Sequence, residues 1–187
     1  DNAFMNPRAA IENAAVSDVN LVFAGTGARI ETEGNDRKNM KLTDVQERAI
    51  LDTAAVNPNT VVVVFAGAPI DMSAWIDEVA AVVWAGFPGE KGDFAVANIL
   101  TGKVNPSGKL SETFPLAFED TPVANGYIDG TVTRYEEGLD VGYRYYDTYN
   151  VPVLFPFGYG LSYAEFNYKN LILKTNGEEL EVSFEIE

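Results

Sequence analysis

Three short apolar runs in the first half of the chain predict β-strands. They cover residues 19–25, 61–66 and 79–84, and the second begins with four consecutive valines. Continuous β-branched runs of this length are typical of parallel strands that are buried on both faces. We therefore expect the centre of the fold to be a mostly parallel sheet.

Helical patterns separate the three predicted strands. Apolar residues at helical spacing predict helices over 7–18 and 90–100. Thr43 is a predicted N-cap, with Gln46 as its capping-box partner, for a helix that ends at Val56. The alternation of strands with helices predicts an α/β layer architecture.

The pattern changes beyond residue 103. Residues 110–115 form a short extended piece, and residues 116–142 are rich in Gly, Asp, Thr and Pro, which predicts long ordered loops. From residue 163 the chain alternates as strands do, and Asn176 with Gly177 predicts a β-hairpin with a type I′ turn. Because a lone hairpin is marginal in water, we expect this tail to begin a larger β-sandwich.

Charge and composition narrow the classes of function. The chain has 187 residues and a net charge of -15, with no histidine and no cysteine. An acidic surface disfavours nucleic acid and anionic membranes as partners, and no apolar run approaches the ~20 residues of a membrane helix. A Ser-His-Asp triad, thiolate catalysis and imidazole or thiolate metal sites are excluded within this chain. Carboxylates must therefore carry any acid–base chemistry.

The segment that follows the first predicted strand concentrates candidate chemistry. It contains Glu31, Glu33, Asp36 and Arg37 around a glycine. Open α/β sheets bind ligands at the carboxyl ends of their strands, so a glutamate here is placed to act as a general acid or base. In an extended loop, Glu31 and Glu33 point to the same side. A solvated charge cluster is the competing explanation, and the spacing does not fit an EF-hand. Gly25 and Gly27 before it do not complete a dinucleotide fingerprint, because Ile30 stands where its third glycine would be.

Aromatic residues supply a second set of candidates. Phe87 lies in a predicted turn, where it is a candidate to line a site. Tyr143, Arg144 and Tyr145 belong to an aromatic cluster that either contacts a sugar ring or builds the core. No cofactor and no metal ion are expected.

Five motifs follow one another in a fixed order along essentially the whole chain. They are residues 33–37 with Leu42, 86–90 with Gly92, 105–110 leading into 113–115, 142–147, and 155–163. Each motif alone is weak evidence. Together they resemble the second domain of the family 3 glycoside hydrolases, the β-glucosidase family.

The resemblance implies a three-layer α/β/α sandwich with a mostly parallel sheet over residues 1–162, incomplete at its start. Residues 163–187 would be the first strands of a fibronectin-type-III-like β-sandwich. The implied activity is that of a retaining β-glycosidase that releases terminal non-reducing β-D-glucosyl residues. Its aspartate nucleophile would lie on a (β/α)8 barrel outside this chain.

The resemblance also assigns roles to residues. The acid/base glutamate maps to Glu33 or, in some members, to Glu31, and Glu33 is favoured. Asp36, Arg37, Phe87, Tyr143, Arg144 and Tyr145 would bind substrate or support the loop.

The implied partners are a β-glucoside or oligosaccharide, and the barrel and the remaining β-sandwich of the same enzyme. The chain opens with neither a methionine nor a signal peptide, so we expect a piece of a longer bacterial protein, cytoplasmic or secreted. A homo-oligomer is one further partner that the sequence leaves open. The isolated chain is expected to have no hydrolytic activity. The alternatives are a non-catalytic carbohydrate-binding or assembly module of the same fold and an unrelated nucleotide-binding module.

Overall fold

A three-stranded parallel sheet forms the centre of the structure, a computed structural model. The residues described are 7–124, 132 and 135–187. The strands lie in the order β1 (Asn20–Gly25), β2 (Thr60–Phe65) and β3 (Ala81–Trp84). Val62, Val63 and Val64 of the central strand are fully buried, as a valine run in a covered parallel strand should be. The predicted parallel sheet is confirmed.

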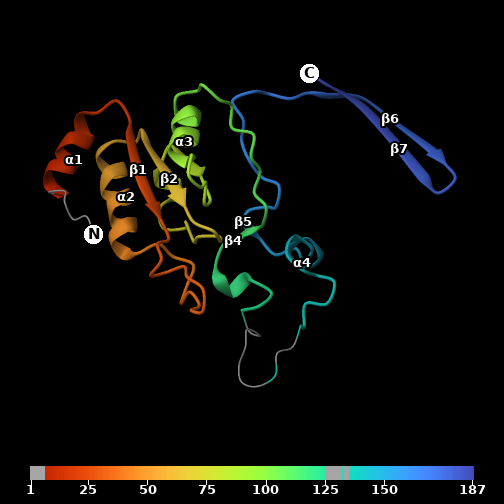
Figure 1. The fold of residues 1–187 in the computed structure, drawn as a ribbon, viewed down its shortest axis with the longest axis horizontal. Coiled ribbons are helices and arrows are strands. Elements are labelled where there is room, and N and C mark those ends of the chain that lie inside the picture. The colour runs from red at the N-terminus through yellow and green to blue at the C-terminus, as the bar shows by residue number, and fades with distance from the viewer. Residues whose placement is uncertain (1–6, 125–131, 133–134) are drawn as a thin grey trace.

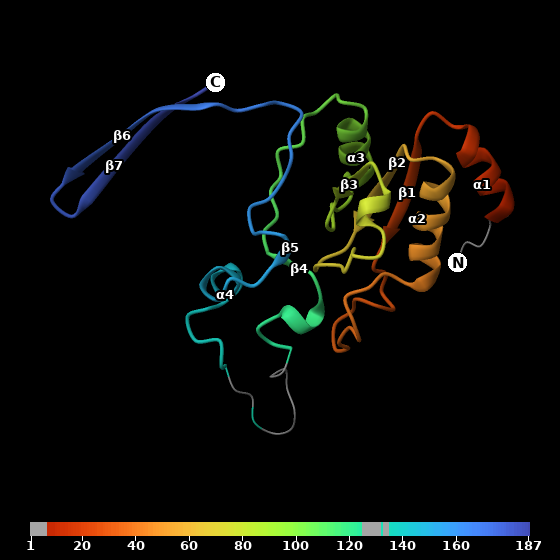
Figure 2. The same ribbon diagram turned by 180° about the vertical axis from the view of Figure 1, so that it is seen from behind.

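Helices cover both sides of this sheet. In Figures 1 and 2, α1 (Pro7–Val16) and α2 (Asp44–Val56) lie together on one side, and α3 (Gly92–Leu100) lies on the other. The predicted capping box is present, because Thr43 accepts a hydrogen bond from the backbone of Gln46 and the Gln46 side chain accepts one from the backbone of Thr43. The chain is thus an α/β fold with helical layers on a parallel sheet.

The main core lies between one face of the sheet and α2. Register aligns the inward side chains of the three strands, which are Val22 and Ala24, Val62 and Val64, and Val82 and Trp84. Ile50 of α2 and Trp75, which precedes the 3₁₀ helix η1 (Ile76–Glu78), fill the space above them and are fully buried. The three strands and α2 therefore share one hydrophobic core.

A short antiparallel pair closes the end of the core beside β3. It consists of β4 (Phe114–Pro115) and β5 (Val153–Phe155). The Phe114 ring meets the Trp84 ring edge-on, with 4.8 Å between ring centroids. The 3₁₀ helix η2 (Phe118–Asp120) follows β4. Of the predicted loop over 116–142, residues 125–131 and 133–134 lie outside the described residues.

One α-helix among the described residues was not predicted. The aromatic segment Tyr143–Tyr149 forms α4, although Tyr is a weak helix former. The missed signals are at its ends. Gly142 precedes it with a φ of 61°, and Asn150 ends it in the left-handed conformation, which is a common C-terminal cap.

The predicted hairpin is present, with a different turn. Strands β6 (Tyr168–Asn176) and β7 (Glu179–Ile186) pair, and Asn176 pairs with Glu179, so the two loop residues are Gly177 and Glu178. Gly177 has a φ of 64°, whereas Glu178 has a negative φ. Type I′ needs positive φ at both positions, so that prediction is wrong, and one glycine at the first position fits type II′.

The hairpin extends away from the rest of the molecule (Figure 1). Every residue of both strands is exposed. No helix in the part of the chain that the structure describes is long and apolar enough to span a bilayer.

Candidate active site

The loops that leave the carboxyl ends of β1 and β2 meet at one edge of the sheet. The β1 loop begins at Thr26, whose backbone N–H donates to the carbonyl oxygen of Phe65 at 2.9 Å. The β2 loop begins one residue after Phe65, with Ala66 fully buried. The two loops therefore start side by side, at the edge where parallel α/β sheets bind ligands.

Glu31 turns back onto the sheet. The N–H groups of Ile30 and Glu31 both donate to the carbonyl oxygen of Gly27, at 2.8 and 3.0 Å, which reverses the chain. The Glu31 carboxylate then accepts hydrogen bonds from the Thr26 hydroxyl and from the backbone N–H of Gly67, the latter at 3.2 Å. One half-buried carboxylate therefore joins the two loops.

Phe87 lies against the same point from the loop that follows β3. A Cβ added to Gly67 would meet Cε2 of Phe87 at 2.5 Å and Oε1 of Glu31 at 2.6 Å. Both distances are far inside van der Waals contact, so only glycine fits here without a shift. The Phe87 ring is 64% exposed, and it forms an aromatic surface beside the Glu31 carboxylate.

Glu33 lies at the tip of a tight turn. Thr32 and Asn35 form an isolated antiparallel bridge, with Glu33 and Gly34 between them, and Gly34 has a φ of 81°. Glu33 is exposed, and it has no hydrogen bond or ion pair with any described residue. The expected extended conformation is wrong, because residues 32–35 form this turn directly after Glu31.

Arg37 and Glu112 add two opposite charges. Nη1 of Arg37 donates to the carbonyl oxygen of Pro69 at 3.2 Å, while its Nε and Nη2 are buried without a hydrogen-bond partner among the described residues. Partial burial and the charge of Glu31 raise the pKa of Glu112, and the charge of Arg37 opposes that rise. Glu112 is exposed to solvent as a residue, so this rise is moderated by solvent screening. Sequence reasoning missed Glu112 because it lies far along the chain from the loop.

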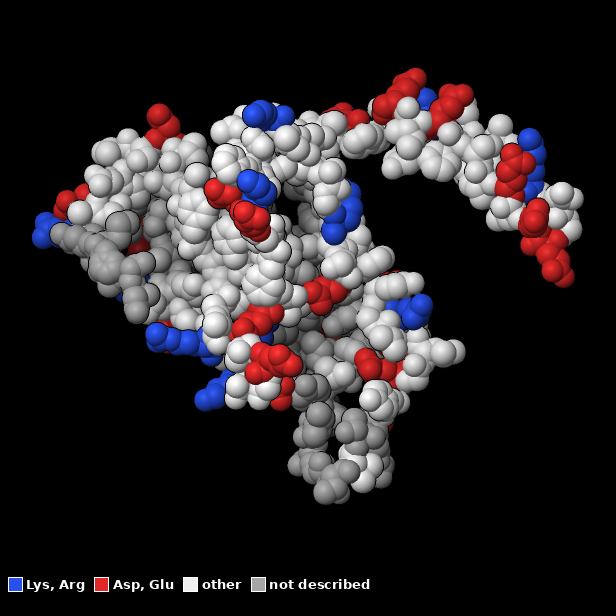
Figure 3. Space-filling view, viewed as in Figure 1, with Lys and Arg blue, Asp and Glu red and all other residues white. Residues whose placement is uncertain are grey.

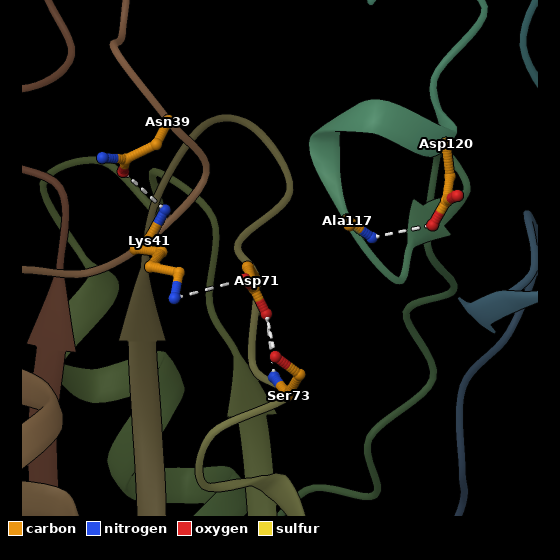
Figure 4. A network of polar contacts seen from close by, with 6 residues as sticks. All are labelled: Asn39, Lys41, Asp71, Ser73, Ala117 and Asp120. Atoms are coloured by element: carbon orange, nitrogen blue, oxygen red, sulfur yellow. Dashed lines mark hydrogen bonds and ion pairs between the residues drawn. The ribbon is translucent and has the colours of Figure 1, made fainter.

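The far end of the acidic loop is also anchored. The backbone N–H of Asp71 donates to the carbonyl oxygen of Met40 at 2.8 Å, and Nζ of Lys41 lies 3.9 Å from the Asp71 carboxylate. Figure 4 shows this contact, together with the hydrogen bonds from Ser73 that hold Asp71 in place. The loop is thus attached to the segment after β2 both near its middle and near its end.

The α4 candidates lie in a separate surface region. The Tyr143 ring stacks on Phe157, with 5.0 Å between centroids, and the Arg144 guanidinium carbon lies 5.4 Å from the Tyr143 centroid. Tyr145 packs on Tyr146. A pocket of about 530 Å³ is lined by Tyr143, Arg144 and neighbouring residues, none of them from the acidic loop.

Tyr146 is the link between α4 and the acidic edge. It is buried, and burial, followed by nearby Tyr145, Asp120 and Glu112, raises its pKa to about 12.

Asp36 lies beyond the Glu33 turn and is exposed. The structure therefore brings Glu31, Arg37 and Phe87 together and leaves Tyr143 and Arg144 apart from them.

Acidic side chains gather over the loops below the sheet in Figure 3. Within the described ranges, no three Asp or Glu side chains are arranged to hold a metal ion. The arrangement offers one exposed carboxyl group on a short turn, one tethered carboxylate and one aromatic surface. In parallel α/β domains, ligands bind at this edge of the sheet.

The chain belongs to glycosyl hydrolase family 3. Residues 5–163 match the model of the glycosyl hydrolase family 3 C-terminal domain. The hairpin lies beyond the matched residues. The resemblance inferred from the five motifs is thus confirmed.

Relatives in bacteria and fungi agree with this assignment. The chain is 46% identical over 159 residues to thermostable beta-glucosidase B of Acetivibrio thermocellus, covering 84% of this chain and 21% of that protein. It is 44% identical over 176 residues to beta-glucosidase B of Emericella nidulans, covering 86% of this chain and 21% of that protein. The chain therefore spans about a fifth of the length of these relatives.

Solved structures share the fold. The β-glucosidase from Kluyveromyces marxianus in complex with glucose superposes with a TM-score of 0.93 at 34% identity, covering all of this chain and 22% of that one. The Bifidobacterium adolescentis GH3 β-glucosidase gives 0.91 at 36% identity, covering 96% of this chain and 27% of that one. The first superposition includes the hairpin, so the α/β part and the hairpin occur together in a longer enzyme.

Proposed function

We propose that this chain is the acid/base part of a retaining β-glucosidase. The enzyme would release terminal non-reducing β-D-glucosyl residues from a β-glucoside or an oligosaccharide. Both the names of the relatives and the family support this reaction. The observation that carries the proposal is the exposed Glu33 carboxyl group, which lies on a short turn at the carboxyl edge of the sheet and has no partner among the described residues.

Glu33 is the proposed catalytic acid because its carboxyl group is available. A general acid must approach the glycosidic oxygen to hydrogen-bond distance. The Glu31 carboxylate already accepts hydrogen bonds from Thr26 and Gly67, and both contacts would have to break before it could reach a glycosidic oxygen. The proton donor is therefore Glu33, and Glu31 stays in the loop framework.

The second carboxyl group of the reaction would come from another domain. In a retaining glycosidase the two carboxyl groups lie about 5–5.5 Å apart, and the one that is not the acid attacks the anomeric carbon. We assign that nucleophile to a (β/α)8 barrel of the same enzyme, docked against the edge that carries Glu33. The β6–β7 hairpin would begin a fibronectin-type-III-like β-sandwich, which would cover its exposed apolar side chains.

The test is a pair of isosteric substitutions in the full-length enzyme. Glu33→Gln keeps the size of the side chain and removes the proton donor, so hydrolysis of cellobiose should fall by roughly 10²–10⁴-fold. An activated dinitrophenyl β-glucoside, whose leaving group needs no proton, should lose far less in its glycosylation step. Full cellobiose activity in Glu33→Gln would remove the proposed role.

The isolated chain supplies the complementary test. It holds one carboxyl group of the pair, so incubation with aryl β-glucosides should release no more product than buffer alone. Turnover by the purified 187-residue chain, free of full-length enzyme, would show that the second group is not on another domain.

A further inference from the structure

We propose that Glu31 is a positioning residue, which fixes the turn that carries the catalytic acid by tying it to the ends of β1 and β2. This inference rests on the proposed role of Glu33. It assigns to Glu31 a task that differs from proton transfer: its carboxylate acts as an acceptor that holds backbone and side chain in place.

The first argument is where the two hydrogen-bond donors come from. The Thr26 hydroxyl belongs to the residue directly after β1, and the Gly67 N–H belongs to the segment after β2. Thr26 is 9% exposed, and Ala66 beside Gly67 is fully buried. Both donors therefore lie within two residues of a strand end, so the carboxylate that accepts from them is tied to the edge of the sheet.

The second argument is how close Glu31 lies to the acid along the chain. The bridge between Thr32 and Asn35 begins at the residue after Glu31, and Glu33 follows Thr32. With Glu31 fixed, few backbone dihedrals remain between the sheet and the acid. Without it, the next hydrogen bond from this loop to the β2 side, among the described residues, is the one from Arg37 to the carbonyl oxygen of Pro69, which lies beyond the turn.

The third argument is the space around the carboxylate. Gly67 leaves no room for a side chain, because a Cβ there would meet Oε1 of Glu31 at 2.6 Å and Phe87 at 2.5 Å. The glycine thus allows the carboxylate to reach the backbone N–H, and the Phe87 ring closes the other side. A carboxylate confined in this way has one orientation, which is what a positioning group needs.

The chain itself provides the variants for a test in the full-length enzyme. Glu31→Gln keeps an oxygen that accepts both hydrogen bonds, whereas Glu31→Ala removes the acceptor. Thr26→Val removes one donor at nearly constant shape. If Glu31 positions the acid, Glu31→Gln should stay close to wild type, and Glu31→Ala should lose about 10–100-fold in kcat on cellobiose, because a misplacement near 1 Å has costs of that order. Thr26→Val should lose activity in the same direction, by less.

The substrate comparison separates this role from a merely structural one. Glu31→Ala should keep most of its glycosylation rate constant with dinitrophenyl β-glucoside, since departure of that leaving group needs no acid. An equal loss on both substrates, accompanied by a lower melting temperature, would overturn the positioning role. Equal inactivation by Glu31→Gln and Glu31→Ala would also overturn it and make Glu31 the acid. Unchanged cellobiose activity in Glu33→Gln would instead count against the proposed function.

Discussion

The carboxyl edge of the parallel sheet and the β6–β7 hairpin are both exposed, but they are built in opposite ways. At the edge, Glu31, Arg37 and Lys41 reach residues far along the chain, so the loop is tied to the sheet. In the hairpin, apolar side chains such as Val182 and Phe184 are about half exposed, and the strands contact mainly each other. The edge loop is therefore held by contacts within this chain, whereas the hairpin is exposed along its whole length.

The two regions differ in how far this chain alone fixes them. The edge loop is fixed by several independent contacts, so it is arranged without the proposed barrel. The hairpin has no such internal support, because a two-stranded ribbon is marginal by itself. Substitutions at the edge should therefore affect catalysis, and substitutions in the hairpin should affect stability only when the covering domain is present.

Among substitutions that leave both glutamates in place, the largest effect should come from filling the space at Gly67. In the full-length enzyme, Gly67→Ala forces Glu31 and Phe87 apart, because the new Cβ would lie within 2.6 Å of both. We expect about a 10–100-fold loss of kcat/KM on cellobiose. Gly27→Ala is the matched control in the same loop, since a Cβ there meets nothing within 4 Å. A harmless Gly67→Ala would show that the carboxylate needs no such confinement.

A matched pair of valines tests the contrast between sheet and hairpin directly. Val62→Ala removes two methyl groups from a fully buried site and should lower the free energy of unfolding of the chain by about 2 kcal/mol. Val182→Ala removes the same groups at a site that is 49% exposed and should cost less than about 0.5 kcal/mol.

Denaturant unfolding of the 187-residue chain measures both costs. Repeating the Val182→Ala measurement in the full-length enzyme tests whether a β-sandwich buries the apolar side chains of the hairpin, as proposed. There the cost should rise towards that of Val62→Ala if a β-sandwich buries the hairpin. Equal, small costs in both proteins would mean that the hairpin stays uncovered.

The smallest effect should be the pH dependence contributed by Glu112. Partial burial and Glu31 raise its pKa in the folded state, so ionising it costs folding stability. That cost is absent below about pH 4, where the carboxyl group is protonated in both states, and it grows as the pH rises through the raised value.

Glu112→Gln should therefore gain melting temperature relative to the wild-type chain as the pH rises from about 4 to 7. The gain should stay below about 2 °C, because solvent screens an exposed residue. Thermal unfolding of both chains over this pH range measures the difference. A gap that narrows with rising pH would show that Arg37, which opposes the shift, dominates instead.

Most of the fold could be predicted from local sequence signals. The valine run predicted the buried central strand, and Thr43 with Gln46 predicted the start of α2. Helix α4 was missed because its seven residues include four tyrosines, and such a composition gives no helical apolar stripe. Its capping signals, Gly142 and Asn150, were visible in the sequence.

The site was harder to predict than the fold. The sequence located the acidic loop and its two glutamates, but it could not separate their roles, because an extended loop places both on one side. Gly34, with its positive φ, was the local sign of the turn that separates them. The donors from Thr26 and Gly67, and the nearby Glu112, depend on the packing of distant segments, which no local pattern reports.

Chemical rescue by azide is the most direct test of Glu33 as the acid/base. Azide needs no general base, so it reacts with a glycosyl-enzyme from which the acid/base side chain has been removed. With dinitrophenyl β-glucoside and azide, full-length Glu33→Ala should form β-glucosyl azide, identified by NMR, and Glu31→Ala should form none. Azide product from Glu31→Ala but not from Glu33→Ala would contradict the account and transfer the role to Glu31.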